Sequence, residues 1–226
     1  METLFLEREK DLIISAIDYI LFSVIIILLV LGTIYRNQVW KDGSTLWADV
    51  VKKSPGSSRA HESFGYASIY KGKMEQGKEH LQIAFRINPN LTEKLMSRGL
   101  ENSDKGMIDS AILEFSTLLL FKPESAEAHY NLGVAYDQKR WVVKAIEQYE
   151  FAIKLKPDFA NAYNNLGIAY GIQGLIDKAI ENFQAATKFQ PEDASFHYNL
   201  SKAYQMKGLH DKAEEEILKA KKLENK

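Results

Sequence analysis

The positions of the prolines constrain this chain more than any other feature of its sequence. The 226 residues contain 5 prolines, and each lies 34 residues from the next: they are Pro55, Pro89, Pro123, Pro157 and Pro191. Proline lacks an amide hydrogen and clashes with the preceding helical turn, so it commonly follows the end of a helix. A fixed interval of this length predicts one helical hairpin in each repeat.

Other residue types keep the same register. Gly133 and Gly167 each follow a leucine, and Ser201 takes the equivalent place in the next repeat. The further series are Tyr136, Tyr170 and Tyr204; Ala145, Ala179 and Ala213; Tyr149, Phe183 and Ile217; and Ala152, Ala186 and Ala220. A small residue at a helix crossing lets two backbones approach, and a large side chain fills the remaining space. The sequence therefore predicts closely packed hairpins.

This pattern of Leu-Gly, Tyr, Ala, an aromatic residue, Ala and Pro resembles the tetratricopeptide repeat (TPR) family. The resemblance implies an all-α fold, a right-handed α-solenoid of helix-turn-helix hairpins. The repeats would be 58–91, 92–125, 126–159, 160–193 and 194–226. Repeat 92–125 diverges most, because Arg98 and Asn102 stand at core-type positions. We expect its first helix to be short or poorly packed.

An apolar stretch precedes the repeats. It runs from Tyr19 to Tyr35 without a charged residue, and as a helix it would span roughly 25 Å, close to the thickness of a bilayer core. A cleaved signal peptide is disfavoured because no small-x-small cleavage site follows the stretch. A buried helix would need a large core around it. The sequence predicts a short flank at 1–11, one transmembrane helix at 12–35 and a single-pass membrane protein.

The junction at 36–57 separates this stretch from the array. Leu46, Trp47 and Val50 have helical spacing, which predicts a capping half-repeat. The junction also resembles the segment after the last transmembrane helix in polytopic O-mannosyltransferase-like TPR proteins, a group in which the array lies outside the cytoplasm. Basic residues such as Lys41 favour a cytoplasmic array instead. The side of the membrane therefore stays open, as does whether the chain is a piece of a larger polytopic protein.

Composition and motifs favour binding over catalysis. A net charge of -1 gives no basic field for nucleic acid, and the absence of cysteine excludes thiolate nucleophiles and cysteine metal sites. Three histidines, His61, His129 and His197, occupy one repeat position on successive hairpins. They cannot converge on one metal ion, so we interpret them as packing residues. We expect no enzymatic activity, no cofactor and no metal site.

One polar series has no place in an apolar core. Asn131, Asn165 and Asn199 precede the Leu-Gly or Leu-Ser pair in three successive repeats. They resemble the asparagine ladder in arrays similar to that of O-linked N-acetylglucosamine transferase, where amides line the concave groove. An amide offers a donor and an acceptor to a peptide backbone. By this resemblance the neighbouring groove residues are Tyr130, Val134, Asn164, Ile168, Tyr198 and Lys202. The alternative is that asparagine is simply an exposed polar residue here.

These features predict a membrane-anchored, non-enzymatic TPR scaffold that binds a protein or peptide segment in its concave groove. An alternative is an accessory or severed TPR portion of a membrane glycosyltransferase system, in which the array recognises acceptor protein. A third hypothesis is self-association through the solenoid. The sequence names neither the partner nor the pathway.

Overall fold

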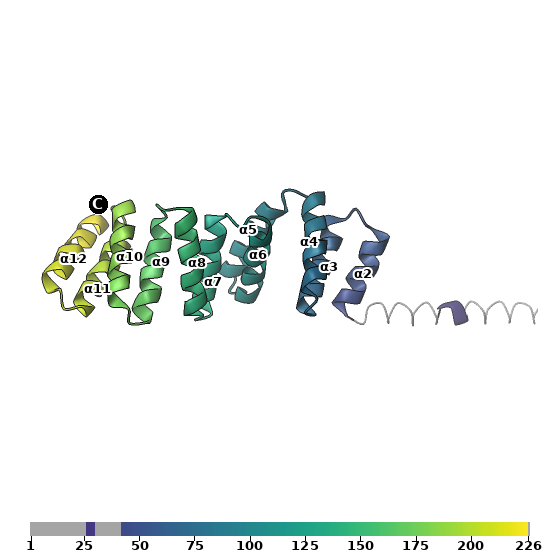
Figure 1. Ribbon diagram of the computed structural model, residues 1–226, viewed down its shortest axis with the longest axis horizontal. Helices are drawn as coiled ribbons and strands as arrows, with labels where there is room; N and C mark the ends of the chain where they lie inside the picture. Colours follow the sequence, from purple (N-terminus) through teal and green to yellow (C-terminus); the bar gives the residue numbers. More distant parts are fainter. Residues whose placement is uncertain (1–25, 30–41, 226) are drawn as a thin grey trace, which may run out of the picture. The chain divides into compact units, whose positions relative to one another are not determined.

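A computed structural model describes residues 26–29 and 42–225 of the chain (Figure 1). Every element in these ranges is a helix, and the contacts divide the chain into one compact unit that ends at Pro89 and a second that begins at Asn90. Within the described ranges, no helix combines the length and the apolar character needed to cross a bilayer. The flank at 1–11 and all of the predicted transmembrane segment except Ile26–Leu29 lie outside the described residues.

Between residues 42 and 89, the first unit contains α2 (Gly43–Lys53), α3 (Ser58–Tyr70) and α4 (Met74–Ile87). Helix α2 begins with a capping box, in which the Asp42 side chain accepts hydrogen bonds from the backbone N–H groups of Ser44 and Thr45. This satisfies N–H groups that have no partner inside the helix. Helix α2 then packs against α3, within the segment where the sequence predicts a capping half-repeat.

The second unit consists of four helical hairpins. Their helices are α5 (Leu91–Asp104), α6 (Ile108–Phe121), α7 (Ala126–Gln138), α8 (Val142–Leu155), α9 (Ala160–Ile172), α10 (Ile176–Phe189), α11 (Ala194–Met206) and α12 (His210–Glu224). Each helix packs against the next one along the chain, and the first helices of neighbouring hairpins also touch, as α5 with α7, α7 with α9, and α9 with α11. Contacts limited to neighbours define a solenoid of repeats (Figure 1).

The hairpins close where a small residue faces a large one. A Cβ placed on Gly133 would lie 2.6 Å from the Tyr149 ring, and one on Gly167 would lie 2.7 Å from the Phe183 ring. The last hairpin has Ser201 at this position, and its buried hydroxyl donates to the backbone carbonyl of Ala213 at 2.7 Å. The predicted matching of small and large residues is therefore the packing rule of these crossings.

The turn inside each hairpin needs a residue with left-handed backbone geometry. Four of the five turns use glycine, at Gly72, Gly106, Gly174 and Gly208. The fifth uses Arg140, with φ of 59°. A side chain in this region crowds the backbone and costs about 1 kcal/mol or more. The turn before α8 is therefore strained in a way that the other turns are not.

The structure corrects our expectation for repeat 92–125. Its first helix, α5, has 14 residues and is as long as α6, so the prediction of a short helix is wrong. Arg98 lies 2.8 Å from Glu114 of α6. This ion pair joins the two helices at a position where the three later hairpins have leucine and the first has Phe64. The ion pair replaces an apolar contact and leaves the helix intact.

Candidate functional site

The predicted groove residues come together on three neighbouring first helices. We call this surface the asparagine face and define it by Tyr130, Asn131, Val134, Asn164, Asn165, Ile168, Tyr198, Asn199 and Lys202. They lie on α7, α9 and α11, whose pairs are in contact. The period of 34 residues places Asn131, Asn165 and Asn199 one hairpin apart, and each is partly buried.

The asparagine amides join one hairpin to the next. The Asn199 amide donates to the Asn164 side-chain oxygen at 2.9 Å, and the Asn164 amide donates to that of Asn165 at 3.3 Å. The Asn165 amide then donates to the Tyr130 hydroxyl at 3.3 Å. These bonds form one polar chain from α11 through α9 to α7. The amide nitrogens therefore have a structural role that sequence reasoning missed.

The amide oxygens at the two ends of the asparagine row keep their acceptor capacity. The Asn131 amide lies 3.5 Å from the Met96 sulfur, a weak acceptor. Among the described residues, none donates a hydrogen bond to the side-chain oxygen of Asn131 or of Asn199. An acceptor on a partly buried surface is available to the backbone N–H groups of an incoming chain.

The other predicted residues differ in how far they reach the surface. Tyr198 and Ile168 are 46% and 39% exposed, and the Lys202 ammonium lies 5.1 Å from the centroid of the Tyr198 ring. Tyr130 and Val134 pack against the apolar core, while Asn164 is buried. These last three residues support the surface from beneath.

Two exposed apolar residues extend the asparagine face and were missed by the sequence reasoning. Ile172 lies one helical turn beyond Ile168, and Met206 one turn beyond Lys202; each is 66% exposed. Because residues four apart share a helix face, this spacing was the signal that could have found them. The face thus combines amide oxygens, an apolar strip and one ammonium.

A buried tyrosine beneath the face makes a hydrogen bond inside the hairpin. The hydroxyl of Tyr149, fully buried, donates to the Asp137 carboxylate at 2.6 Å. Burial raises the pKa of Asp137, and the hydrogen bond from Tyr149 partly opposes that rise. Burial also raises the pKa of Tyr130. Tyr130 therefore remains neutral at physiological pH.

Each recurrent histidine joins a turn to a helix of its own hairpin. The Nε2 atom of His129 lies 3.0 Å from the Pro123 carbonyl oxygen, and its Nδ1 atom lies 2.8 Å from the Gln148 side-chain oxygen. The same two contacts join His61 to Pro55 and His80, and His197 to Pro191 and Glu216. Each ring ties the turn before its hairpin to the second helix of that hairpin. Their place in the repeat therefore has a structural reason.

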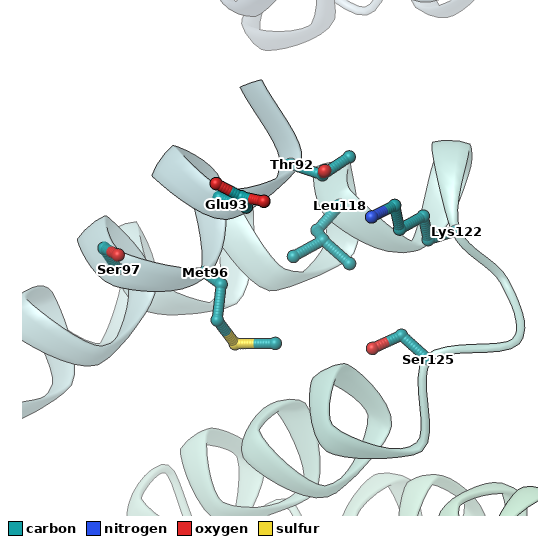
Figure 2. Close-up of a pocket in the computed structure, with 7 residues that line it drawn as sticks. All are labelled: Thr92, Glu93, Met96, Ser97, Leu118, Lys122 and Ser125. Carbon is teal, nitrogen blue, oxygen red and sulfur yellow. The ribbon is translucent and has the colours of Figure 1, made fainter. Parts of the chain in front are cut away.

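A pocket that the sequence did not reveal lies at the start of the second unit (Figure 2). It is lined by Thr92, Glu93, Met96, Ser97, Leu118, Lys122 and Ser125. Its volume is about 340 Å³, near the lower end of the range for small-ligand sites. Figure 2 shows that α5, α6 and the turn before α7 contribute these side chains. Met96 also touches the Asn131 amide, so the pocket adjoins the end of the asparagine row.

The fold and the face define the chain as an array of helical hairpins. Family models for the TPR repeat match residues 143–174 and 172–208, and one for the tetratricopeptide repeat matches 194–226. A crystal structure of MamA is 30% identical, covers 71% of this chain and 94% of its own, and superposes with a TM-score of 0.58. The chain belongs to the tetratricopeptide repeat family.

Two further structures extend the comparison. MamA 41-end from Desulfovibrio magneticus RS-1 is 25% identical over 74% of this chain and 95% of its own, with a TM-score of 0.57. YrrB, described as a TPR protein with an unusual peptide-binding site, is 20% identical over 78% of this chain and 91% of its own, with a TM-score of 0.56. The likeness to YrrB shows a shared fold. No curated protein matched the sequence.

Proposed function

We propose that this chain is a non-enzymatic scaffold that binds a protein or peptide segment on the asparagine face. The observation that carries the proposal is the juxtaposition of amide acceptors at Asn131 and Asn199 with exposed apolar side chains at Ile168 and Tyr198. Backbone N–H groups of an extended segment pair with such acceptors, while its apolar side chains cover the strip. The TPR fold and the neighbours of this fold support a role in protein interaction.

The test uses variants that change the surface without touching the hydrogen bonds between hairpins. Peptides selected for binding to the full chain by phage display are measured by calorimetry against the double variant Ile168→Ser, Ile172→Ser. The control is Val143→Ser on α8, whose side chain is 72% exposed. We expect at least about tenfold weaker binding for the double variant, because apolar burial is lost, and unchanged binding for the control. Equal affinity for all three proteins would refute the proposed face.

Membrane attachment is the second part of the proposal. The segment 12–35 would anchor the chain as one transmembrane helix, with the side of the TPR domain left open. The support comes from the uncharged stretch in the sequence and from Ile26–Leu29, which are helical and 45% to 67% exposed. Four successive residues cover every side of a helical turn. Resistance to carbonate extraction, and its loss when residues 1–40 are deleted, would support the anchor; release of the full chain would refute it.

The remaining hypotheses stay predictions. An accessory role in a membrane glycosyltransferase system rests on the resemblance of the junction at 36–57, and neighbouring genes for multi-span transferases would support it. Self-association would appear in light scattering as a mass above that of the monomer. A monomeric mass in detergent would refute it.

A further inference from the structure

The next repeat of the array shows which kind of side chain fits the pocket lined by Met96 and Lys122. One repeat later, the equivalent space is occupied by aromatic side chains of the protein itself. The ring centroids of Tyr130 and Phe159 are 4.9 Å apart, and the Lys156 ammonium lies 4.9 Å from the Phe159 centroid and 3.6 Å from the Glu127 carboxylate. A ring therefore sits between a second ring, a cation and a carboxylate-bearing helix.

The frame of this site recurs one repeat earlier, but its rings do not. Counting back 34 residues, Lys122 and Glu93 are equivalent to the charged pair Lys156 and Glu127. Ser125 is equivalent to Phe159, and Met96 is equivalent to Tyr130. Loss of two rings from one place leaves the volume of about 340 Å³. The opening is therefore the specific space that a ring occupies in the neighbouring hairpin.

The chemistry of the walls suits an aromatic group. Figure 2 shows Met96 and Leu118 on the helices beside the opening, with Lys122 and Ser125 at its other side. Among the residues described by the structure, no carboxylate forms an ion pair with Lys122. An unpaired ammonium is attracted to the electron-rich face of a ring. A methionine sulfur likewise makes favourable contacts with aromatic rings.

The pocket also adjoins the asparagine face, the proposed peptide-binding surface. The 3.5 Å contact between the Asn131 amide and the Met96 sulfur places its wall at the end of the asparagine row. The Ser125 hydroxyl is already engaged, because it accepts the hydrogen bond from the Ala128 amide that caps α7. The ligand is therefore defined by apolar contact and by the cation, rather than by hydrogen bonds to this serine.

We propose that this pocket binds one aromatic side chain of a partner peptide, with Lys122 against the face of the ring and Met96 and Leu118 against its edges. The proposal deepens the proposed function and rests on it for the source of the ring, a peptide lying along the asparagine face. The ring would complete in trans the site that Phe159 completes within the chain one repeat later.

The direct test uses an aromatic probe rather than an unknown partner. The full chain, labelled with carbon-13 in its methionine methyl groups, is titrated with N-acetyl-4-fluoro-L-phenylalanine amide. We expect saturable binding at about millimolar affinity, as suits a fragment of this size, with a downfield ring-current shift of the Met96 methyl because it lies at the edge of the ring. Met74, 48% exposed at the start of α4, is the internal control and should not shift. N-acetyl-L-leucine amide should produce at least about tenfold weaker binding, because it has no ring for either the cation or the methionine sulfur.

Variants decide whether the pocket itself binds the ring. Binding by the variants is followed as broadening of the fluorine-19 signal of the probe. Met96→Tyr supplies the ring found in the next repeat and should abolish this broadening. Lys122→Ala should weaken binding about threefold or more through loss of the cation, whereas Lys156→Ala, at the site already filled by Phe159, should leave it unchanged. Because Lys122→Ala does not alter a buried group, it keeps the test decisive even if Met96→Tyr fails to fold. An unshifted Met96 methyl, or equal binding by all variants, overturns the proposal.

The selected peptides separate failure of the pocket from failure of the proposed function. Peptides with an aromatic residue at one fixed position, weakened by Met96→Tyr, would support both. Peptides that depend on Ile168 and Ile172 but show no aromatic preference would overturn the pocket and leave the peptide face standing. Probe binding without any peptide that depends on Ile168 would support the pocket as an aromatic site and refute the peptide face.

Discussion

Replacement of Tyr149 by phenylalanine tests the buried contact beneath the asparagine face. The ring itself fits without its hydroxyl, because Phe183 occupies the equivalent position in the next hairpin. What the variant loses is the 2.6 Å hydrogen bond to Asp137. That carboxyl already has a raised pKa because burial disfavours its charged form. Tyr149→Phe therefore removes a donor from a group that is costly to leave unpaired.

The expected loss depends on the charge of Asp137. A hydrogen bond to an ionised group contributes about 1.5–3 kcal/mol, and one between neutral groups about 0.5–1.5 kcal/mol. Without the tyrosine hydroxyl, the pKa of Asp137 in the folded state rises further. A pKa raised by folding gives stability that is complete below the unfolded pKa and is lost as pH rises through the folded pKa. The variant should therefore lose more stability at about pH 7 than at about pH 4.

The assay is urea denaturation followed by circular dichroism at both pH values. The matched control is Tyr170→Phe, which removes a 2.7 Å hydrogen bond to Glu150. The Glu150 side chain is exposed, so water can replace the lost donor, and we expect a loss below about 1 kcal/mol. Equal losses for the two variants at both pH values would refute the reasoning, as would a Tyr149→Phe loss that does not shrink at the lower pH.

Five further variants probe the packing, turns and charges of the array. Gly167→Ala should cost about 1–2 kcal/mol in urea denaturation because its methyl would lie 2.7 Å from a phenylalanine ring; Gly171→Ala on the same helix meets nothing within 4 Å and should instead gain about 0.5–1 kcal/mol. Ser201→Ala should cost about 1 kcal/mol in the same assay because it deletes a buried hydrogen bond. Arg140→Gly should raise the midpoint of thermal unfolding, with a gain of about 1 kcal/mol from relief of the left-handed backbone; an unchanged midpoint would argue against strain. Burial alone would raise the pKa of Glu216, but hydrogen bonds from a histidine and a lysine outweigh it and lower the pKa. The stabilisation from Glu216 is therefore present above the unfolded pKa of about 4.3 and is lost as pH falls through the folded pKa. Glu216→Gln should flatten this part of the pH profile of stability.

The sequence alone determined the repeat, its register and the close crossings. The interval between prolines sets the length of one hairpin, and the same interval aligns Gly167 with Gly133 and Phe183 with Tyr149. Pairing of a small and a large residue is local to one hairpin, so it can be derived from spacing within a single repeat. The period also placed Asn131, Asn165 and Asn199 at equivalent points, although their binding role remains a prediction.

Only the tertiary structure decided how equivalent residues in different repeats are used. The spacing of the asparagines does not show that the Asn165 amide bonds to Tyr130 on the preceding hairpin, because a hydrogen bond depends on distances of tenths of an ångström between separate helices. The pocket arises where Met96 and Ser125, 29 residues apart, meet at one place without rings. A period identifies which positions correspond, whereas packing between helices determines whether they are filled, paired or open.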